Sequence, residues 1–243
     1  MIVYYYNTYQ AMRMKNLSLH QFLRRLTSME QTLSPAQAVE LQEAAAGLII
    51  QQPFALDNIS SIAGADVSVK GDMAQAALVV MRMDDFSIIE TKTHLQRIDF
   101  PYIPGLLAFR EAPLLIQAFK KLATRPDLAL VDGHGLCHPR FFGLASHFGL
   151  AMDIPTIGVA KSRLVGDRPE PGPQKGDWAP VSFKGRQVAM AMRSRAGVKP
   201  VYISIGHRMD LPSAARIVLR CLTKYRLPEP IRAAHRAAGA WPE

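Results

Sequence analysis

Residues 61–96 read SIAGADVSVKGDMAQAALVVMRMDDFSIIETKTHLQ, and this stretch predicts three successive β-strands. The first two are Ser61–Val69 and the apolar run Ala76–Met83, and the third, Phe86–Gln96, alternates more loosely. Short turns such as Lys70–Asp72 separate them. Strands joined by short turns pair in antiparallel fashion, so the stretch predicts a three-stranded antiparallel meander.

Further elements lie on both sides of the meander. Before it, Ser34 and Gln37 have capping-box spacing and predict the start of a helix. After it, strands and helices alternate, which indicates one α/β domain with a mixed central sheet flanked by helices. The predicted helices are Leu114–Leu122, Arg140–Met152 and Asp210 to about Tyr225, and the predicted strands are Leu128–Val131, Pro155–Ala160, Gln187–Arg193 and Val201–Ile205.

Both ends of the chain are expected to lie outside this domain, which we place at residues 29–230. Residues 1–28 contain no Asp or Glu and are interpreted as an extension, or as sequence upstream of a mis-assigned start. Prolines at 228 and 230 end the last predicted helix, so residues 231–243 are predicted to form a loose C-terminal tail.

The composition is that of a globular protein with a polyanionic partner. The 243 residues are 49% hydrophobic and carry a formal net charge of +9, which favours nucleic acid first and an anionic membrane surface second. No apolar run approaches the ~20 residues of a membrane helix, so no membrane association is expected. The only cysteines, Cys137 and Cys221, are far apart in sequence, which fits a cytoplasmic protein.

Two prolines, Pro101 and Pro104, bracket Tyr102 and Ile103. A proline fixes its own φ and disfavours helical geometry in the preceding residue, so this segment is predicted to be a short, stiff turn. The turn would hold a large aromatic side chain outward, and Gly105 would allow close backbone approach beside it. Such a segment is typical either of a rigid apolar wedge or of a proline-rich surface loop that leads into a helix.

Three acids in separate predicted elements lie beside apolar or small residues: Asp66, Glu111 and Asp132. Burying a carboxylate as an ion is costly unless it is paired or binds a metal. If the three converge, they form an all-oxygen site that selects Mg²⁺ or Mn²⁺, and two such ions would assist a phosphoryl displacement. The alternatives are a solvent-facing edge acid at Asp66 and a helix or turn cap at Asp132.

Lys161 and His207 each follow a predicted strand, so both are expected at a strand end that could reach the same site. Lys161 would neutralise charge on a phosphate. His207 would orient the attacking water or act as a further ligand. A solvated surface position is the alternative for each of them.

Histidine and cysteine residues also gather at His134, Cys137, His138 and His147. Their spacing lacks the paired-ligand pattern of a structural zinc site, so zinc is a weak alternative. The run from His138 to Arg140 is more typical of a phosphate contact near a helix N-terminus. A further basic series on the last predicted helix would contact a phosphate backbone or simply face solvent: Arg216, Arg220 and Lys224.

Together these motifs resemble the endonuclease V family, the deoxyinosine 3′ endonucleases. The resemblance runs from about Leu33 to Pro230, and several segments in the same order make it more specific than any single motif. The segments are Ile62–Val67, Pro101–Gly105, Phe109–Glu111, Val131–Gly135, His138–Arg140, Ala145–Gly149, Pro155–Lys161, Gly206–Arg208 and Tyr225–Pro230.

The resemblance implies a ribonuclease H-like fold and a Mg²⁺-dependent nuclease that acts on hypoxanthine in DNA. It implies hydrolysis of the second phosphodiester 3′ of the lesion, leaving 3′-hydroxyl and 5′-phosphate ends. Carried to this sequence, it assigns the metal to Asp66, Glu111 and Asp132, with Lys161 and His207 assisting in catalysis.

The resemblance also assigns Tyr102, Ile103 and Pro104 to a wedge that fills the gap left by a displaced base. Arg110 and Arg140 are candidates for phosphate contacts. The implied hypoxanthine pocket is lined by Gly105, Leu107, Gly133, Gly135 and His138.

Two other functions stay open at this point. An endoribonuclease specific for inosine in RNA is not separated from the DNA enzyme by sequence. A non-cleaving nucleic-acid-binding module on the same fold is the alternative from another class, and acids at all three metal positions argue against it. We expect a monomer.

Overall fold

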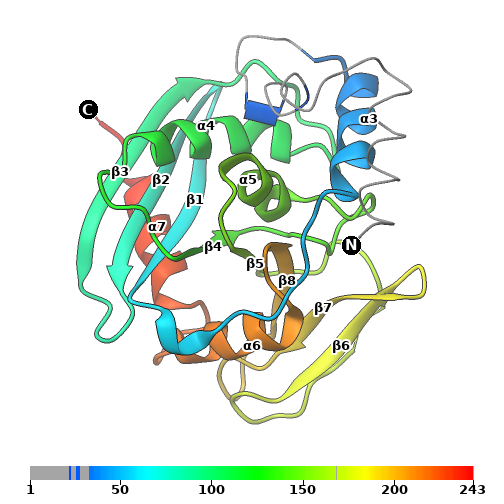
Figure 1. The fold of residues 1–243 in the computed structure, drawn as a ribbon, viewed down its shortest axis with the longest axis vertical. Coiled ribbons are helices and arrows are strands. Elements are labelled where there is room, and N and C mark those ends of the chain that lie inside the picture. Colours follow the sequence, from blue (N-terminus) through cyan, green and yellow to red (C-terminus); the bar gives the residue numbers. More distant parts are fainter. Residues whose placement is uncertain (1–21, 23–25, 28–32, 168, 243) are drawn as a thin grey trace.

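The computed structural model describes residues 22, 26–27, 33–167 and 169–242. One eight-stranded sheet crosses the molecule in the order β3-β2-β1-β4-β5-β8-β7-β6 (Figure 1). β1, β4 and β5 are parallel, and the other neighbouring pairs are antiparallel. The strands are β1 (Ser61–Lys70), β2 (Met73–Arg82), β3 (Ile88–Arg97), β4 (Leu128–Asp132), β5 (Thr156–Ala160), β6 (Trp178–Phe183), β7 (Arg186–Met192) and β8 (Val201–His207).

The predicted meander and the mixed α/β class are both confirmed. β1 pairs with β2 along its full length, from Ser61 opposite Arg82 to Lys70 opposite Met73. β3 extends the pairing on the far side of β2. The other edge of β1 joins the parallel strand β4, so β1 lies between the meander and the alternating half of the fold.

Helices cover both faces of the sheet (Figure 1). On one face, α4 and α5 pack on side chains such as Ala65 and Val131. On the other face, α6 and α7 pack on side chains such as Ile62 and Leu130. The described helices of the body are α3 (Pro35–Ala46), α4 (Ala108–Lys120), α5 (Leu144–Met152), α6 (Leu211–Arg220) and α7 (Glu229–Gly239).

α7 lies unusually close to β1, and Gly64 makes this possible. A Cβ added to Gly64 would lie only 1.8 Å from the carbonyl oxygen of Pro230. Any side chain at this position would therefore push the start of α7 away from the sheet. Because Asp66 lies two residues further along and faces the same side, the close approach brings α7 over Asp66.

The C-terminal tail predicted for residues 231–243 is wrong, because residues as far as Gly239 belong to α7. Ile231, Ala234 and Ala238 are buried on one face of this helix. Pro230 lies in the first turn, where a missing N–H removes no helical hydrogen bond. A proline that we took as a stop signal therefore opens the helix.

Three predicted helix boundaries also differ. α4 begins six residues early, at Ala108, and contains Pro113 within it. α5 begins only at Leu144, because Phe141 has a positive φ of 55° that interrupts helical geometry. α6 ends at Arg220, and the chain then turns back so that the Glu229 N–H donates to the Cys221 carbonyl.

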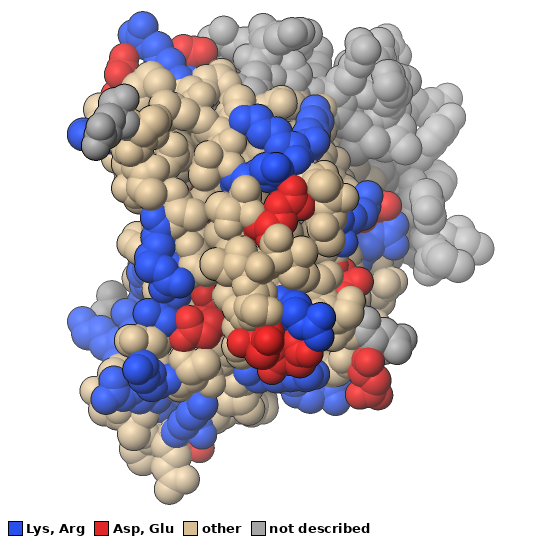
Figure 2. All heavy atoms as spheres, turned by 90° about the vertical axis from the view of Figure 1, so that its left-hand side faces the viewer, with Lys and Arg blue, Asp and Glu red and all other residues tan. Residues whose placement is uncertain are grey.

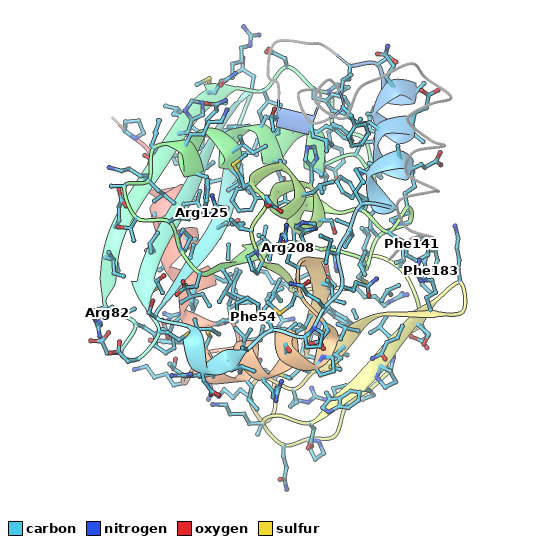
Figure 3. All side chains as sticks on the ribbon, in the orientation of Figure 1. Phe54, Arg82, Arg125, Phe141, Phe183 and Arg208 are labelled. Carbon is cyan, nitrogen blue, oxygen red and sulfur yellow. The ribbon has the colours of Figure 1, made fainter. Side chains whose placement is uncertain are left out.

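The strand β6 was not predicted. It forms a hairpin with β7, and Pro180 within it is tolerated because β6 is the edge of the sheet. Phe183 packs against Phe141, with ring centroids 5.8 Å apart (both labelled in Figure 3). The hairpin is thereby fixed to the loop that follows β4.

The N-terminal end of the described chain packs on the domain. Ser34 and Gln37 form the predicted capping box at the start of α3. Phe22 and Leu26, inside the predicted extension, are buried, and the Leu26 carbonyl accepts a hydrogen bond from His147 Nε2 at 2.8 Å. The other residues of 1–28 except Thr27 lie outside the described residues, so the mis-assigned start stays a prediction. In the described part of the chain, no helix has the length and apolarity to span a membrane.

Candidate metal centre and wedge

Two acids from neighbouring strands meet a histidine from α7. Ala65 of β1 pairs with Val131 of β4, so the residues that follow, Asp66 and Asp132, lie side by side. Both carboxylates lie on the α7 side of the sheet, where His235 Nδ1 is 2.7 Å from Asp66 Oδ2. One ligand atom from each of Asp66, Asp132 and His235 lies within 4.8 Å of the other two. This is the arrangement expected of a divalent metal site.

His235 was missed in the sequence because we did not predict its helix. The signal was present, since Ile231, Ala234 and Ala238 repeat at helical spacing. With the helix assigned, His235 lies on its exposed side, next to Arg236. Its proximity to Asp66 depends on the packing of α7 and could not have been read from the pattern.

The two carboxylates repel each other. Burial and then the charge of Asp132 raise the pKa of Asp66, although His235 and the Val67 N–H both stabilise its ionised form. Lys161 Nζ contacts Asp132 Oδ2 at 2.6 Å and offsets part of the negative charge. A divalent cation between the two acids would offset the rest, so the electrostatics favour metal binding.

Glu111 approaches the same place from the other face of the sheet, in the first turn of α4. It does not belong to the group of three mutually close ligand atoms. Burial, the charge of Asp66 and the charge of Asp132 nonetheless raise its pKa to about 7, with Arg110 acting in the opposite direction. Glu111 therefore lies near enough to respond to both acids and holds a proton at neutral pH part of the time.

Replacing Glu111 with Gln is expected to stabilise the metal-free protein at pH 8 but not at pH 4. A raised pKa favours folding below the ordinary value of 4.5, and this benefit is lost as the pH rises through about 7. Glu111→Gln should raise the free energy of unfolding by about 2 kcal/mol at pH 8, measured by urea denaturation with EDTA. Glu43→Gln on the exposed side of α3 is the matched control. An equal change at both pH values would contradict the assignment.

The prediction that His207 reaches this site is wrong. β8 runs antiparallel to β5, so His207 lies opposite Thr156, whereas Asp132 lies beside Val159 at the other end of β5. His207 is buried, accepts a hydrogen bond from the Ile50 N–H and lies 3.5 Å from Asp153.

Burial lowers the pKa of His207 to about 4. Arg125 and Arg208, labelled in Figure 3, both contact Asp153 and mark this opposite end of the sheet.

The proline-bracketed segment forms the predicted stiff turn. Leu106 N–H donates to the Ile103 carbonyl at 2.9 Å, with Pro104 at the second position and Gly105 at the third with a φ of 79°. This is the sequence that a type II turn requires. Tyr102 is 68% exposed, and the guanidinium of Arg110 lies 5.8 Å from its ring centroid. The aromatic ring is therefore presented to solvent from a rigid support.

A buried network holds this turn in place. The Gly105 carbonyl accepts from three side chains: His138 Nε2 at 3.0 Å, Arg140 Nη2 at 2.6 Å and Gln42 Nε2 at 3.1 Å. Arg140 Nε also donates to Gln42 Oε1. These bonds direct Arg140 to the turn, and its role as a phosphate contact stays a prediction. Gln42, which the sequence did not single out, joins α3 to the turn.

The residues predicted to line a lesion pocket lie on two loops in contact. Gly105 lies on the proline-bracketed turn and Leu107 just after it, and Gly133, Gly135 and His138 lie on the loop after β4. The His138–Gly105 hydrogen bond joins the loops. A Cβ on Gly135 would lie 1.9 Å from the Ile205 carbonyl oxygen, so only glycine fits there.

Burial lowers the pKa of His138 to about 4, and the Arg140 N–H donates to its Nδ1. The ring is therefore neutral and carries its proton on Nε2. Among the described residues, His134, Cys137, His138 and His147 form no group of three ligand atoms within 4.8 Å of one another.

The net charge of +9 is distributed unevenly. Figure 2 views the β2–β3 side of the molecule, where basic side chains gather toward the lower left and acidic ones lie among them nearer the centre. The excess of basic side chains favours a polyanionic partner such as nucleic acid.

The fold and the site define a ribonuclease H-like protein with an acidic centre between two parallel strands. The family model of Endonuclease V matches residues 42–236. Endonuclease V of Trichormus variabilis is 42% identical over 208 residues, which are 85% of this chain and 94% of the relative. The chain belongs to the endonuclease V family.

Solved structures of endonuclease V have the same fold as this chain. Endonuclease V of Streptomyces avermitilis superposes with a TM-score of 0.83 at 36% identity, covering 87% of this chain and 94% of that one. Endonuclease V of Ciona intestinalis, in complex with a 23mer DNA containing an inosine followed by a ribo-adenosine, gives a TM-score of 0.75 at 30% identity. That match covers 85% of this chain and 97% of the Ciona chain.

Proposed function

We propose that this protein is a DNA repair endonuclease that recognises deoxyinosine. It hydrolyses the second phosphodiester 3′ of the lesion and leaves 3′-hydroxyl and 5′-phosphate ends. The observation that carries the proposal is the convergence of Asp66, Asp132 and His235 in a chain that also presents an exposed aromatic on a rigid turn. The inosine-containing DNA bound by the Ciona relative supports the substrate.

The donor set fits a hard divalent cation, and we propose Mg²⁺, with Mn²⁺ as a substitute. Asp66 and Asp132 would hold it, with Glu111 as a further carboxylate close by. When bound, such an ion supplies Lewis-acid stabilisation of the oxygens at the reacting phosphorus.

The chain's own residues have distinct roles around the ion. His235, 64% exposed in its side chain and fixed by Asp66, is placed to accept a proton from an attacking water. Lys161 places its positive charge beside Asp132, where it offsets negative charge on the scissile phosphate. Glu111 would add a further carboxylate beside the ion, whose charge would counteract the rise in its pKa caused by burial and the two aspartates.

The wedge explains how a base is inspected. A base must leave the stack to enter a pocket, at a cost of a few kcal/mol that is least for a weakly paired base such as hypoxanthine. Tyr102 would enter the gap and offset part of that cost by stacking. Because Glu111 follows Tyr102 closely in the chain, the wedge and the metal centre keep a fixed separation, which would fix the offset between lesion and cut.

An oligonucleotide with one deoxyinosine at a known position tests this proposal. In Mg²⁺ the protein should nick that strand once, at the second phosphodiester 3′ of the lesion, and EDTA should stop the reaction. The same strand with adenine should stay intact. Binding without a nick in either Mg²⁺ or Mn²⁺ would instead indicate a non-cleaving module.

One observation favours a second candidate, an inosine-specific endoribonuclease. The DNA bound by the Ciona relative carries a ribo-adenosine directly after the inosine. Nicking rates on matched all-DNA, all-RNA and mixed strands decide between the two, and the proposed DNA enzyme requires the all-DNA strand to be cut at least as fast as the RNA strand. We further propose a cytoplasmic protein, since both cysteines are buried and free. A monomer stays our expectation.

A further inference from the structure

Basic side chains surround the turn between α6 and α7. Lys175 Nζ donates to the Leu222 carbonyl at 2.9 Å, and Arg195 Nη1 donates to the Lys224 carbonyl at 3.4 Å. The guanidinium of Arg226 donates to backbone carbonyls on two other loops. We call this set the basic rim; its members are Lys175, Arg195, Lys199, Lys224 and Arg226.

The charge of the basic rim is not compensated by acids. In the described part of the chain, none of its five members makes an ion pair with a carboxylate. Among the acids nearby in sequence, Glu170 pairs with Arg193 and Glu229 pairs with Arg232. Asp177, two residues after Lys175, instead accepts a hydrogen bond from the Gln174 N–H. Carbonyl acceptors fix the side chains of Lys175, Arg195 and Arg226 without neutralising them, so the rim keeps a net positive charge.

The basic rim continues directly from the metal centre. Arg226 Nη2 donates to the carbonyl of Lys161, the residue whose Nζ pairs with Asp132. Arg226 also donates to the carbonyl of Pro200, just before β8. Because β8 is antiparallel to β5, the first residues of β8 lie beside the last residues of β5, which Lys161 follows. From β4 to β8 is two strand spacings, about 10 Å.

An exposed aromatic lies within the rim. Tyr225 is 39% exposed, with Lys224 Nζ 5.4 Å and the Arg232 guanidinium 3.3 Å from its ring centroid. Cations interleaved with an exposed aromatic are typical of surfaces that follow a nucleic acid strand, where phosphates meet the charges and a base or sugar meets the ring.

We propose that the basic rim binds the phosphates of the cleaved strand on the 3′ side of the cut. This inference rests on the proposed function, because the wedge and pocket hold the lesion and the cut lies 3′ of it. The strand then passes the metal centre and continues over Lys161 to the rim. The two strand spacings correspond to about three nucleotides at ~3.4 Å each.

The double variant Arg195→Ala/Lys224→Ala tests the proposal, because both residues are exposed and neither belongs to the catalytic centre. The matched control is Arg82→Ala/Arg125→Ala. These two cations are also exposed, but they lie at the opposite end of the sheet, Arg82 opposite Ser61 at the start of β1 and Arg125 just before β4. Thermal unfolding of both variants checks that the fold is retained.

Binding is measured without divalent ions on an inosine oligonucleotide, over a series of salt concentrations. The rim variant should bind about tenfold more weakly than the control, with a salt dependence shallower by about 1.4 in log–log slope. On a strand that ends one nucleotide 3′ of the cut, the two variants should bind equally. Equal binding on the long strand, or an equal loss on both strands, would overturn the proposal.

The two proposals can fail separately. An adenine strand of the same length should show the same tenfold loss, since the rim contacts phosphates rather than the lesion. If wild-type protein fails to nick inosine DNA, the proposed function fails whatever the rim does. If wild type nicks normally and the rim variant binds like the control, only the inference about the rim fails.

Discussion

Replacing Asp132 with Asn is expected to abolish strand nicking without unfolding the protein. The amide keeps the shape of the side chain but removes one of the two charges that would hold the metal, and it removes the partner of Lys161. The loss of stabilisation at the reacting phosphate should lower the nicking rate by about 1,000-fold in Mg²⁺. Initial rates on a deoxyinosine oligonucleotide at pH 8 measure it.

The control for this variant is Asp153→Asn. Asp153 is also an aspartate with ion-pair partners, but it contacts Arg208 and His207 at the far end of the sheet. Its conversion to Asn should leave the nicking rate within about twofold, because nothing near the metal changes. A retained rate in Asp132→Asn, with its fold verified, would remove Asp132 from the catalytic centre.

Replacing Tyr102 with Ala is expected to reduce the preference for inosine over adenine by about tenfold or more, because one stacking contact with a base contributes ~1–3 kcal/mol. Since Tyr102 is 68% exposed, the fold should be unaffected. The measurement is kcat/KM on paired strands with inosine or adenine at the same position. Tyr102→Phe should retain the preference, because the ring remains.

Trp178→Ala provides the comparison for the wedge. Trp178 is another exposed aromatic, 52% accessible, at the start of the edge strand β6. The other end of this strand, at Phe183, is the one that contacts the loop after β4. Trp178→Ala should have the same preference for inosine over adenine as the wild-type protein. If Tyr102→Ala selects inosine as well as wild type does, the exposed ring is not the wedge and the turn has only a structural role.

Local patterns in the sequence were sufficient for much of the fold. The apolar run of β2 and the short turns beside it predict the meander. Strands joined by only a few residues pair with each other in antiparallel fashion. The capping box at Ser34 is read from four residues. Asp132 at the end of β4 was also readable, because the apolar run before it defines a buried strand.

The site residues that we misplaced or missed depend on strand direction and on long-range packing. His207 and Lys161 both follow strands, and only the antiparallel course of β8 separates them to opposite ends of the sheet. Nothing in the side-chain pattern of a buried strand indicates its direction. His235 reaches Asp66 because Gly64 lets α7 lie against β1, a contact between residues far apart in sequence.

The partners of Arg140 were also not readable from the sequence. Its sequence neighbourhood, next to a histidine and a proline, is typical of a phosphate contact. In the structure its guanidinium is held by the Gly105 carbonyl and by Gln42, which lies 98 residues away. These partners are set by the tertiary fold and cannot be read from the residues next to Arg140 in sequence.

The measurement that tests the metal centre most directly is anomalous diffraction from crystals soaked in Mn²⁺. A strong anomalous peak should appear between the carboxylates of Asp66 and Asp132, beside His235, and it should disappear in Asp132→Asn crystals. A soak that yields no peak there, or one that places the ion among His134, His138 and Cys137 instead, would contradict the account.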